Sequence, residues 1–140
     1  MKKIITYGTF DLLHIGHIRL LERARALGNY LIVGLSTDEF NEIKGKSAIY
    51  CYEDRRKILL ALRVVDEVIA ETTWSQKRYD ILQRQAEILV MGDDWVGQFD
   101  DLSDVTQIAY LPRTENISTT RVKTDIRSAE QVSHGGVIRL

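Results

Sequence analysis

The hydrophobic residues of this chain fall into two kinds of segment that alternate along its length. Short continuous apolar runs are typical of strands covered on both faces, whereas apolar residues spaced three or four apart are typical of amphipathic helices. The runs predict strands over Ile4–Phe10, Tyr30–Leu35, Val64–Ala70, Ile88–Met91 and Gln107–Leu111.

Helical periodicity fills most of the chain between these runs. The pattern predicts a helix over Ile18–Leu27 and another from about Tyr52, with Ile58, Leu59 and Leu62 as its apolar stripe. A third is predicted over Lys77–Gln85, with Tyr79 and Leu82 on one face and Ile81 adding apolar bulk. The last is predicted from Ser118, its N-cap, to about Arg127. The polar start Ser36–Asp38 leads into a short turn over Glu39–Ile43, and Lys44–Tyr50 has so little periodicity that it is predicted to be a loop.

Strands that alternate with helices favour an α/β fold in which a parallel sheet is covered by helices on both faces. We expect an open, five-stranded parallel sheet, formed by residues 1–127 as a single domain. Residues 128–140, which include Gly135 and Gly136 among scattered polar residues, are expected to form a loosely ordered tail.

Composition excludes some classes of partner but does not identify the function. The formal net charge is −1, so nothing favours nucleic acid or an anionic membrane as a partner, and no apolar stretch is long enough to cross a bilayer. Cys51 is the only cysteine, which excludes an internal disulfide and fits a reducing, cytoplasmic setting.

Most of the chemically suggestive residues follow the predicted strands. They lie in Thr9–His17, at Lys44 and Lys46, at Asp93 and Asp94, and in Arg113–Arg121. In an open parallel sheet, ligands bind outside the carboxyl ends of the strands, where the strand order reverses. The sequence therefore predicts one crevice that gathers these segments.

The most informative pair is His14 and His17, just after the first predicted strand. Two imidazoles three residues apart at a helix start could hold a phosphate chain, because unpaired backbone N–H groups and the helix dipole already favour an anion there. A bound polyphosphate would favour protonated rings. The alternatives are a helix-start residue beside an incidental polar side chain, or a zinc site, for which no further His or Cys is suitably spaced.

A second cluster surrounds the start of the last predicted helix. Ser118, Thr119 and Thr120 offer hydroxyl and backbone donors to a phosphate, and Arg113 and Arg121 add charged, forked donors. An ordinary helix cap with solvated arginines would explain Ser118 alone. The run of hydroxyls between two arginines favours phosphate binding.

Further candidates are weaker. Lys44 and Lys46 could fold over bound phosphates, although loop lysines are usually only solvated. Asp11 and Asp94 could hold a metal ion or order other side chains, or could simply cap turns. Trp74 and Lys77 could line the place of an acceptor molecule, with core packing as the alternative for Trp74.

Two motifs carry a resemblance to a known superfamily. Tyr7–His17 resembles the His-x-Gly-His motif of nucleotidyltransferases with a Rossmann-like fold, and Arg113-Thr114-Glu115 followed by Ile117–Thr120 resembles their second motif. Asn116 stands where that motif has glycine. Over residues 1–127 the chain is similar to bacterial cytidylyltransferases that act on glycerol 3-phosphate, including the segments Ser36–Asn41, Val65–Ile69 and Val90–Trp95.

The resemblance implies two groups of site residues. The nucleotide would be bound by Thr9, Phe10, Asp11, His14, Gly16, His17, Lys46, Asp94, Arg113, Thr114, Glu115, Ile117, Ser118, Thr119 and Thr120. The acceptor would be bound or its site shaped by Lys44, Arg55, Arg63, Asp66, Trp74 and Lys77. His14, His17, Lys44, Lys46 and Arg113 would stabilise the charge that develops during the reaction.

The resemblance also implies a reaction. We expect CMP to move from CTP to sn-glycerol 3-phosphate, with Mg²⁺ as cofactor, giving CDP-glycerol and pyrophosphate for cell-surface polymers such as teichoic acids. A homodimer is expected. The alternatives are cytidylyl or adenylyl transfer to another phosphorylated alcohol or sugar, or a regulatory domain that binds nucleotide without turnover.

Overall fold

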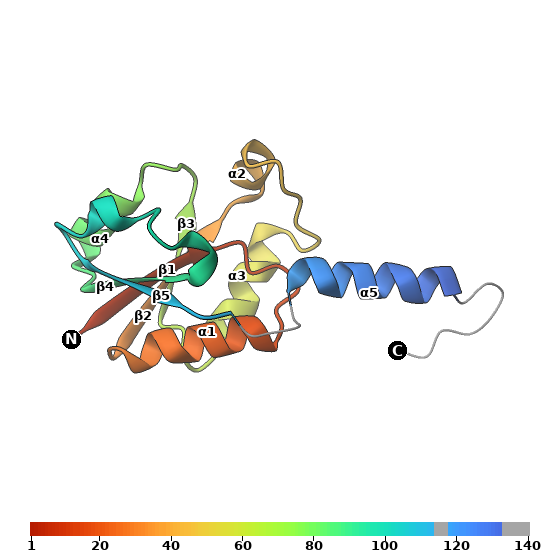
Figure 1. Ribbon diagram of the computed structural model, residues 1–140, viewed down its shortest axis with the longest axis horizontal. Helices are drawn as coiled ribbons and strands as arrows, with labels where there is room; N and C mark the ends of the chain where they lie inside the picture. Colours follow the sequence, from red (N-terminus) through yellow and green to blue (C-terminus); the bar gives the residue numbers. More distant parts are fainter. Residues whose placement is uncertain (114–117, 133–140) are drawn as a thin grey trace.

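A parallel sheet lies at the centre of the molecule. The structure is a computed structural model that describes residues 1–113 and 118–132. Its strands are β1 (Lys3–Gly8), β2 (Tyr30–Ser36), β3 (Glu67–Glu71), β4 (Ile88–Gly92) and β5 (Gln107–Leu111). They pair in the order β3-β2-β1-β4-β5, every pair parallel (Figure 1). This confirms the predicted Rossmann-like α/β fold with its open five-stranded sheet.

Helices cover both faces of this sheet. They are α1 (Ile15–Ala26), α2 (Asp38–Ile43), α3 (Tyr52–Leu60), α4 (Lys77–Arg84) and α5 (Thr119–Val132), with short 3-10 helices η1 (Asp93–Trp95) and η2 (Asp100–Leu102). Leu21 of α1 and Leu59 of α3 pack on the face that contains Ile4. Ile81 of α4 packs on the other face, against Ile5. Neighbouring residues of β1 thus place their side chains in the hydrophobic cores on opposite faces of the sheet, because side chains alternate along a strand.

The segment between β1 and α1 differs from its prediction. The strand ends at Gly8, two residues before Phe10, because Phe10 (φ 49°) and Leu12 (φ 48°) adopt left-handed conformations that no strand contains. The helix begins at Ile15, three residues before the predicted Ile18, because His14 acts as its N-cap. β3 also begins late, at Glu67.

The predicted apolar face of α4 is wrong for two of its residues, and that of α3 is wrong for one. On α4, Tyr79 and Leu82 are exposed, and the buried residues are Lys77, Asp80 and Ile81. On α3, Leu59 is buried and the following Leu62 packs against the same core, as predicted, but Ile58 is exposed and the charged Arg55 is buried. Both helices therefore turn charged side chains inward, which periodicity of apolar residues does not reveal.

The last helix, α5, extends away from the body of the molecule (Figure 1). It continues to Val132, five residues beyond the predicted end at Arg127. The division of the chain at Arg127 into a domain and a tail stays a prediction. No helix among residues 1–113 and 118–132 is long and apolar enough to cross a membrane.

Candidate active site

Three adjoining cavities open at the carboxyl ends of the strands, and Thr9 lines all of them. The histidine cavity, of about 330 Å³, contains His14 and His17. The loop cavity, of about 460 Å³, contains Lys46. The lysine cavity, of about 220 Å³, contains Lys44. They lie where the strand order reverses between β1 and β4, as predicted.

The two histidines form a reciprocal cap at the start of α1. The Nδ1 atom of His14 accepts a hydrogen bond from the Gly16 N–H at 3.0 Å, and Nδ1 of His17 accepts one from the His14 N–H at 3.1 Å. His17 therefore takes the place that Glu or Gln occupies in an ordinary capping box. The imidazoles stack with their centroids 3.8 Å apart.

These bonds determine which nitrogen carries the proton. A nitrogen that accepts a hydrogen bond is unprotonated, so each neutral ring has its proton on Nε2. Burial lowers the pKa of His17 to about 4, with the adjacent His14 adding to the effect, and burial also lowers the pKa of His14. Both rings are consequently neutral donors at pH 7. The expectation that a bound polyphosphate would favour protonated rings stays a prediction. The cap argues against it, because a second proton on Nδ1 would break the cap.

The two Nε2 atoms have different surroundings. In the described part of the chain, the buried Nε2 of His14 has no hydrogen-bond partner. Nε2 of His17 lies 3.5 Å from the hydroxyl of Thr119, which donates its own proton to the Asp11 carbonyl at 2.9 Å. His17 must then be the donor in its contact with Thr119.

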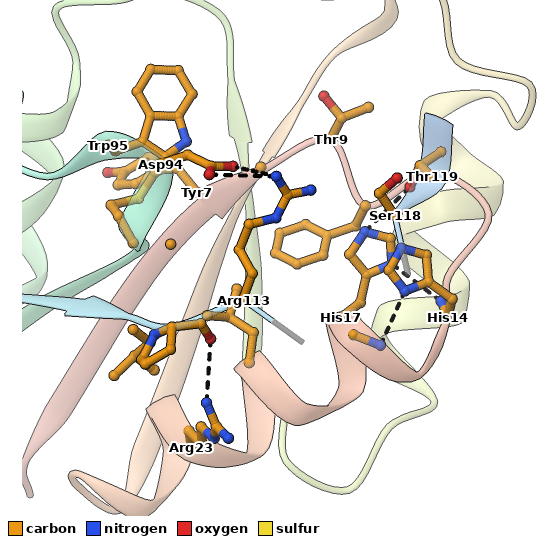
Figure 2. Close-up of a pocket in the computed structure, with 18 of the residues that line it drawn as sticks. Tyr7, Thr9, His14, His17, Arg23, Asp94, Trp95, Arg113, Ser118 and Thr119 are labelled. Carbon is orange, nitrogen blue, oxygen red and sulfur yellow. Dashed lines mark hydrogen bonds and ion pairs between the residues drawn. The ribbon is translucent and has the colours of Figure 1, made fainter. Parts of the chain in front are cut away.

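Arg113 lies between the two sides of the histidine cavity. Figure 2 shows Asp94 and Trp95 on one side of it and the imidazoles with Ser118 and Thr119 on the other. The Arg113 guanidinium pairs with the Asp94 carboxylate at 3.2 Å, and both side chains are about half exposed. A guanidinium held so loosely can turn toward a phosphate.

The turn that carries Thr9 and Asp11 is held from several directions. The buried Asp11 carboxylate accepts hydrogen bonds from the Ile49 and Tyr50 N–H groups at 2.7 and 3.0 Å. Arg55 donates to the Thr9 carbonyl at 2.9 Å. These contacts offset the left-handed residues on either side of Asp11, each of which costs about 1–3 kcal/mol.

Lys123 joins α5 to the loop after α2. Its ammonium lies 3.5 Å from the Asp11 carboxylate and donates to the Ser47 carbonyl at 3.1 Å. Lys123, Ser47 and Lys46 all line the loop cavity. Lys46 is exposed, so its charge is available to a ligand there.

The lysine cavity combines three cations with one carboxylate. Lys44, Lys46 and Lys77 line it together with Glu71. The buried Lys77 ammonium donates to Glu71 at 2.7 Å, whereas that of Lys44 lies 4.7 Å from the Phe40 ring centroid. Trp74, also in this cavity, is 59% exposed, which excludes core packing for it.

The structure brings most of the predicted site residues together. Those that line the histidine cavity are Thr9, Phe10, His14, Gly16, His17, Asp94, Arg113, Ser118, Thr119 and Thr120. Asp11 and Lys46 line the loop cavity, and Lys44, Trp74 and Lys77 line the lysine cavity. Thr114, Glu115 and Ile117, with Asn116, lie outside the described residues.

Three predicted acceptor residues do not line these cavities. Arg55 is buried and donates hydrogen bonds to four groups. They are the carbonyls of Tyr50, Thr9 and Ser36 and the Asp38 carboxylate. Arg55 therefore holds the backbone of the site in place and does not line these cavities. Asp66 accepts hydrogen bonds from Leu31 N–H and Arg25 near the amino ends of β2 and β3, at the opposite edge of the sheet. The exposed Arg63 precedes it by three residues.

Two residues of the site were missed by sequence reasoning. Glu71 is the last residue of β3, and Lys123 follows Thr119 by four positions on α5. Both could have been found from their positions. Glu71 ends a parallel strand, where ligands bind, and Lys123 lies four residues after Thr119 and so shares its face of the helix.

Comparison with known proteins agrees with this geometry. Residues 5–125 match the sequence model described as cytidylyltransferase-like. The chain is 60% identical over 126 residues to a glycerol-3-phosphate cytidylyltransferase of Bacillus subtilis, covering 90% of this chain and 98% of that protein. It is 55% identical to a glycerol-3-phosphate cytidylyltransferase of Staphylococcus aureus, covering 90% of this chain and 96% of that one.

A solved structure shares the fold at lower identity. The crystal structure of the lipopolysaccharide core biosynthesis protein from Thermoplasma volcanium superposes with a TM-score of 0.69 and 23% identity. The match covers 84% of this chain and 99% of that one.

Proposed function

The chain belongs to the cytidylyltransferase-like family, and on that premise we propose that it transfers a cytidylyl group from CTP to sn-glycerol 3-phosphate. The products are CDP-glycerol and pyrophosphate. The observation that supports this chemistry is the histidine pair, whose Nδ1 atoms accept hydrogen bonds in the cap, so that each neutral ring has its proton on Nε2, the group that would donate to phosphate.

The reaction needs no covalent enzyme intermediate. A phosphate oxygen of glycerol 3-phosphate attacks the α-phosphorus of CTP, a new P–O bond forms, and the bond from the α-phosphorus to the β-phosphate oxygen breaks. Pyrophosphate leaves with that electron pair. Because the attacking phosphate is already an anion at neutral pH, no strong general base is required.

Catalysis then consists of alignment and charge stabilisation. Holding two anions in line for reaction can lower the barrier by roughly 7–11 kcal/mol. His14, His17 and Arg113 surround the cavity that would receive the triphosphate. Lys44 lies in the lysine cavity toward the acceptor, and Lys46 lines both that cavity and the loop cavity. One preorganised donor of this kind contributes on the order of 10²–10³ in kcat.

Mg²⁺ is the proposed cofactor, and the nucleotide would supply most of its ligands. Among residues 1–113 and 118–132 there is no group of three or more His, Cys, Asp or Glu side chains that could hold a metal ion. Mg²⁺ characteristically binds through one or two carboxylates plus substrate phosphates and water. Asp94 is the carboxylate in the histidine cavity that fits this role. When bound, the ion would neutralise phosphate charge.

The setting of the reaction is a further part of the proposal. CDP-glycerol is an activated form of glycerol phosphate, which suits the synthesis of cell-surface polymers such as teichoic acids. The lone Cys51 supports a cytoplasmic location. The resemblance to the family supports a homodimer.

A steady-state assay with CTP, Mg²⁺ and glycerol 3-phosphate tests the reaction. We expect CDP-glycerol, identified by mass, and pyrophosphate in equal amounts. Faster turnover with ATP, ethanolamine phosphate or a sugar phosphate would assign the same site to a different transfer. Binding of CTP without pyrophosphate release from any of these acceptors would show a regulatory nucleotide-binding domain instead.

A further inference from the structure

The lysine cavity contains an acidic residue that a site for an anion does not need. Glu71 is buried and is the only acidic side chain among the described residues that line this cavity. Its Oε2 accepts a hydrogen bond from the Lys77 ammonium at 2.7 Å. Within the described residues Oε1 has no such partner and is not among the enclosed unpaired atoms, so it is accessible from the cavity.

A carboxylate beside an ammonium is matched to a hydroxyl group rather than to a phosphate. A hydroxyl can donate its proton to Glu71 and accept a hydrogen bond from Lys77 at the same time. A phosphate oxygen only accepts, and its negative charge would be repelled by the carboxylate. The pair therefore disfavours the phosphate end of an acceptor and favours its alcohol end.

Two further cations line the same cavity. Lys44 and Lys46 form no ion pair with any described residue. Lys46 and Thr9 also line the loop cavity, so this pair of cations adjoins the rest of the site. A molecule with a phosphate at one end and hydroxyls at the other would thus lie with its phosphate toward Lys44 and Lys46.

We propose that Glu71, with Lys77, binds the hydroxyl groups of the acceptor and so determines both its orientation and its selection. The inference rests on the proposed function and deepens it, because it assigns the alcohol end of glycerol 3-phosphate to a named pair. Lys77 then acts on the hydroxyls rather than on the reacting phosphate. Its ammonium also lies 4.7 Å from the Tyr7 ring centroid and 5.3 Å from that of Phe99, which fixes its direction.

The test compares two acceptors in two enzymes. Glycerol 3-phosphate and n-propyl phosphate share a three-carbon chain and a phosphate, but only the first has hydroxyls. In Glu71→Gln, which keeps the size of the side chain, we expect kcat/KM for glycerol 3-phosphate to fall on the order of tenfold to a hundredfold, as when a hydrogen bond to a charged group is lost. The value for n-propyl phosphate should change less than about threefold, and the dissociation constant of CTP should stay the same.

Glu67→Gln is the matched control. Glu67 lies on the same strand and pairs with Arg84 at 3.1 Å, but it is at the far end of β3 and does not line the cavity. Its substitution should leave kcat/KM unchanged for both acceptors. If Glu71→Gln lowers the activity with both acceptors by the same factor, or with neither, the inference is overturned.

Further measurements separate the possible failures. The parental enzyme must itself prefer glycerol 3-phosphate to n-propyl phosphate by at least about tenfold, and equal use of the two would overturn the inference even if Glu71→Gln did not fold. If the parental enzyme makes no CDP-glycerol at all, the proposed function fails. If it makes CDP-glycerol but its selectivity does not depend on Glu71, the proposed function stands and only the present inference fails.

Discussion

The ammonium of Lys123 lies 3.5 Å from the buried carboxylate of Asp11 and so connects the last helix to the turn after the first strand. The same ammonium donates to the Ser47 carbonyl, and Asp11 accepts from the backbone of Ile49 and Tyr50. One ion pair thus ties α5 to the loop that carries Lys46. Both sides of the loop cavity depend on this contact.

Removing the Lys123 charge should weaken nucleotide binding. In Lys123→Met we expect the KM for CTP to rise about tenfold, because the loop loses a charge-assisted hydrogen bond that holds it against α5. The KM for glycerol 3-phosphate should change less. Arg127→Met, four residues further along α5 and exposed, is the control. Equal KM values for CTP in both variants would refute the connection.

The capping role of the histidines can be separated from their role as donors. His17→Gln supplies the residue usual at this position of a capping box, and His14→Asn supplies a common N-cap. Both variants should therefore keep α1 and unfold within about 1 kcal/mol of the parental protein. Each should lower kcat by on the order of 10²–10³, because the Nε2–H donor is lost.

Circular dichroism and urea unfolding provide the check on structure, and steady-state kinetics provide the check on activity. A folded His17→Gln variant that turns over at the parental rate would remove His17 from the reaction. If a variant loses activity because it has also lost its folded structure, the histidines act only as capping residues.

Stability should fall in mild acid because of His17. Its pKa is lowered to about 4 in the folded protein, from an ordinary value of 6.5, so between these values the unfolded chain binds more protons. The free energy of unfolding therefore decreases as pH falls from 6.5 to 4, by at most about 3 kcal/mol from this residue. Chemical unfolding at a series of pH values measures the slope. His17→Gln should flatten it, and an unchanged slope would contradict the assignment.

The floor of the lysine cavity depends on close packing between β1 and β2. A Cβ added at Gly34 would overlap the Tyr7 ring, which cannot move aside freely because its hydroxyl donates to Asp80 at 2.7 Å. Gly34→Ala should destabilise the protein by about 1–3 kcal/mol, measured by urea unfolding. At Gly92 a Cβ would meet nothing within 4 Å, so Gly92→Ala is the comparison. Equal stability of the two variants would exclude this role for Tyr7.

The fold was predictable because its signals are local and repeated. Segments rich in apolar residues marked all five strands, and β5 has the predicted bounds. The charged residues on the inner faces of α3 and α4 were not predictable, since Arg55 and Asp80 are buried through partners distant in sequence and Lys77 through Glu71, six residues before it. Periodicity of apolar residues contains no information about such pairs.

The site was predictable to the extent that its chemistry follows the strand ends. Most of the residues singled out there line one connected group of cavities. The proton positions on His14 and His17 were not predictable, because they depend on the cap geometry rather than on residue type. The same holds for the left-handed backbone at Phe10 and Leu12, residues that rarely adopt it.

The proton positions on the two imidazoles provide the most direct test. Two-bond ¹H–¹⁵N correlation spectra of protein with ¹⁵N-labelled histidine, recorded at pH 7 with and without CTP, report which nitrogen is protonated. We predict neutral rings with the proton on Nε2 for His14 and His17 in both states, and a shift of the Nε2 signals when CTP is added. A neutral ring whose only proton lies on Nδ1, in either state, would contradict the proposed donation from Nε2.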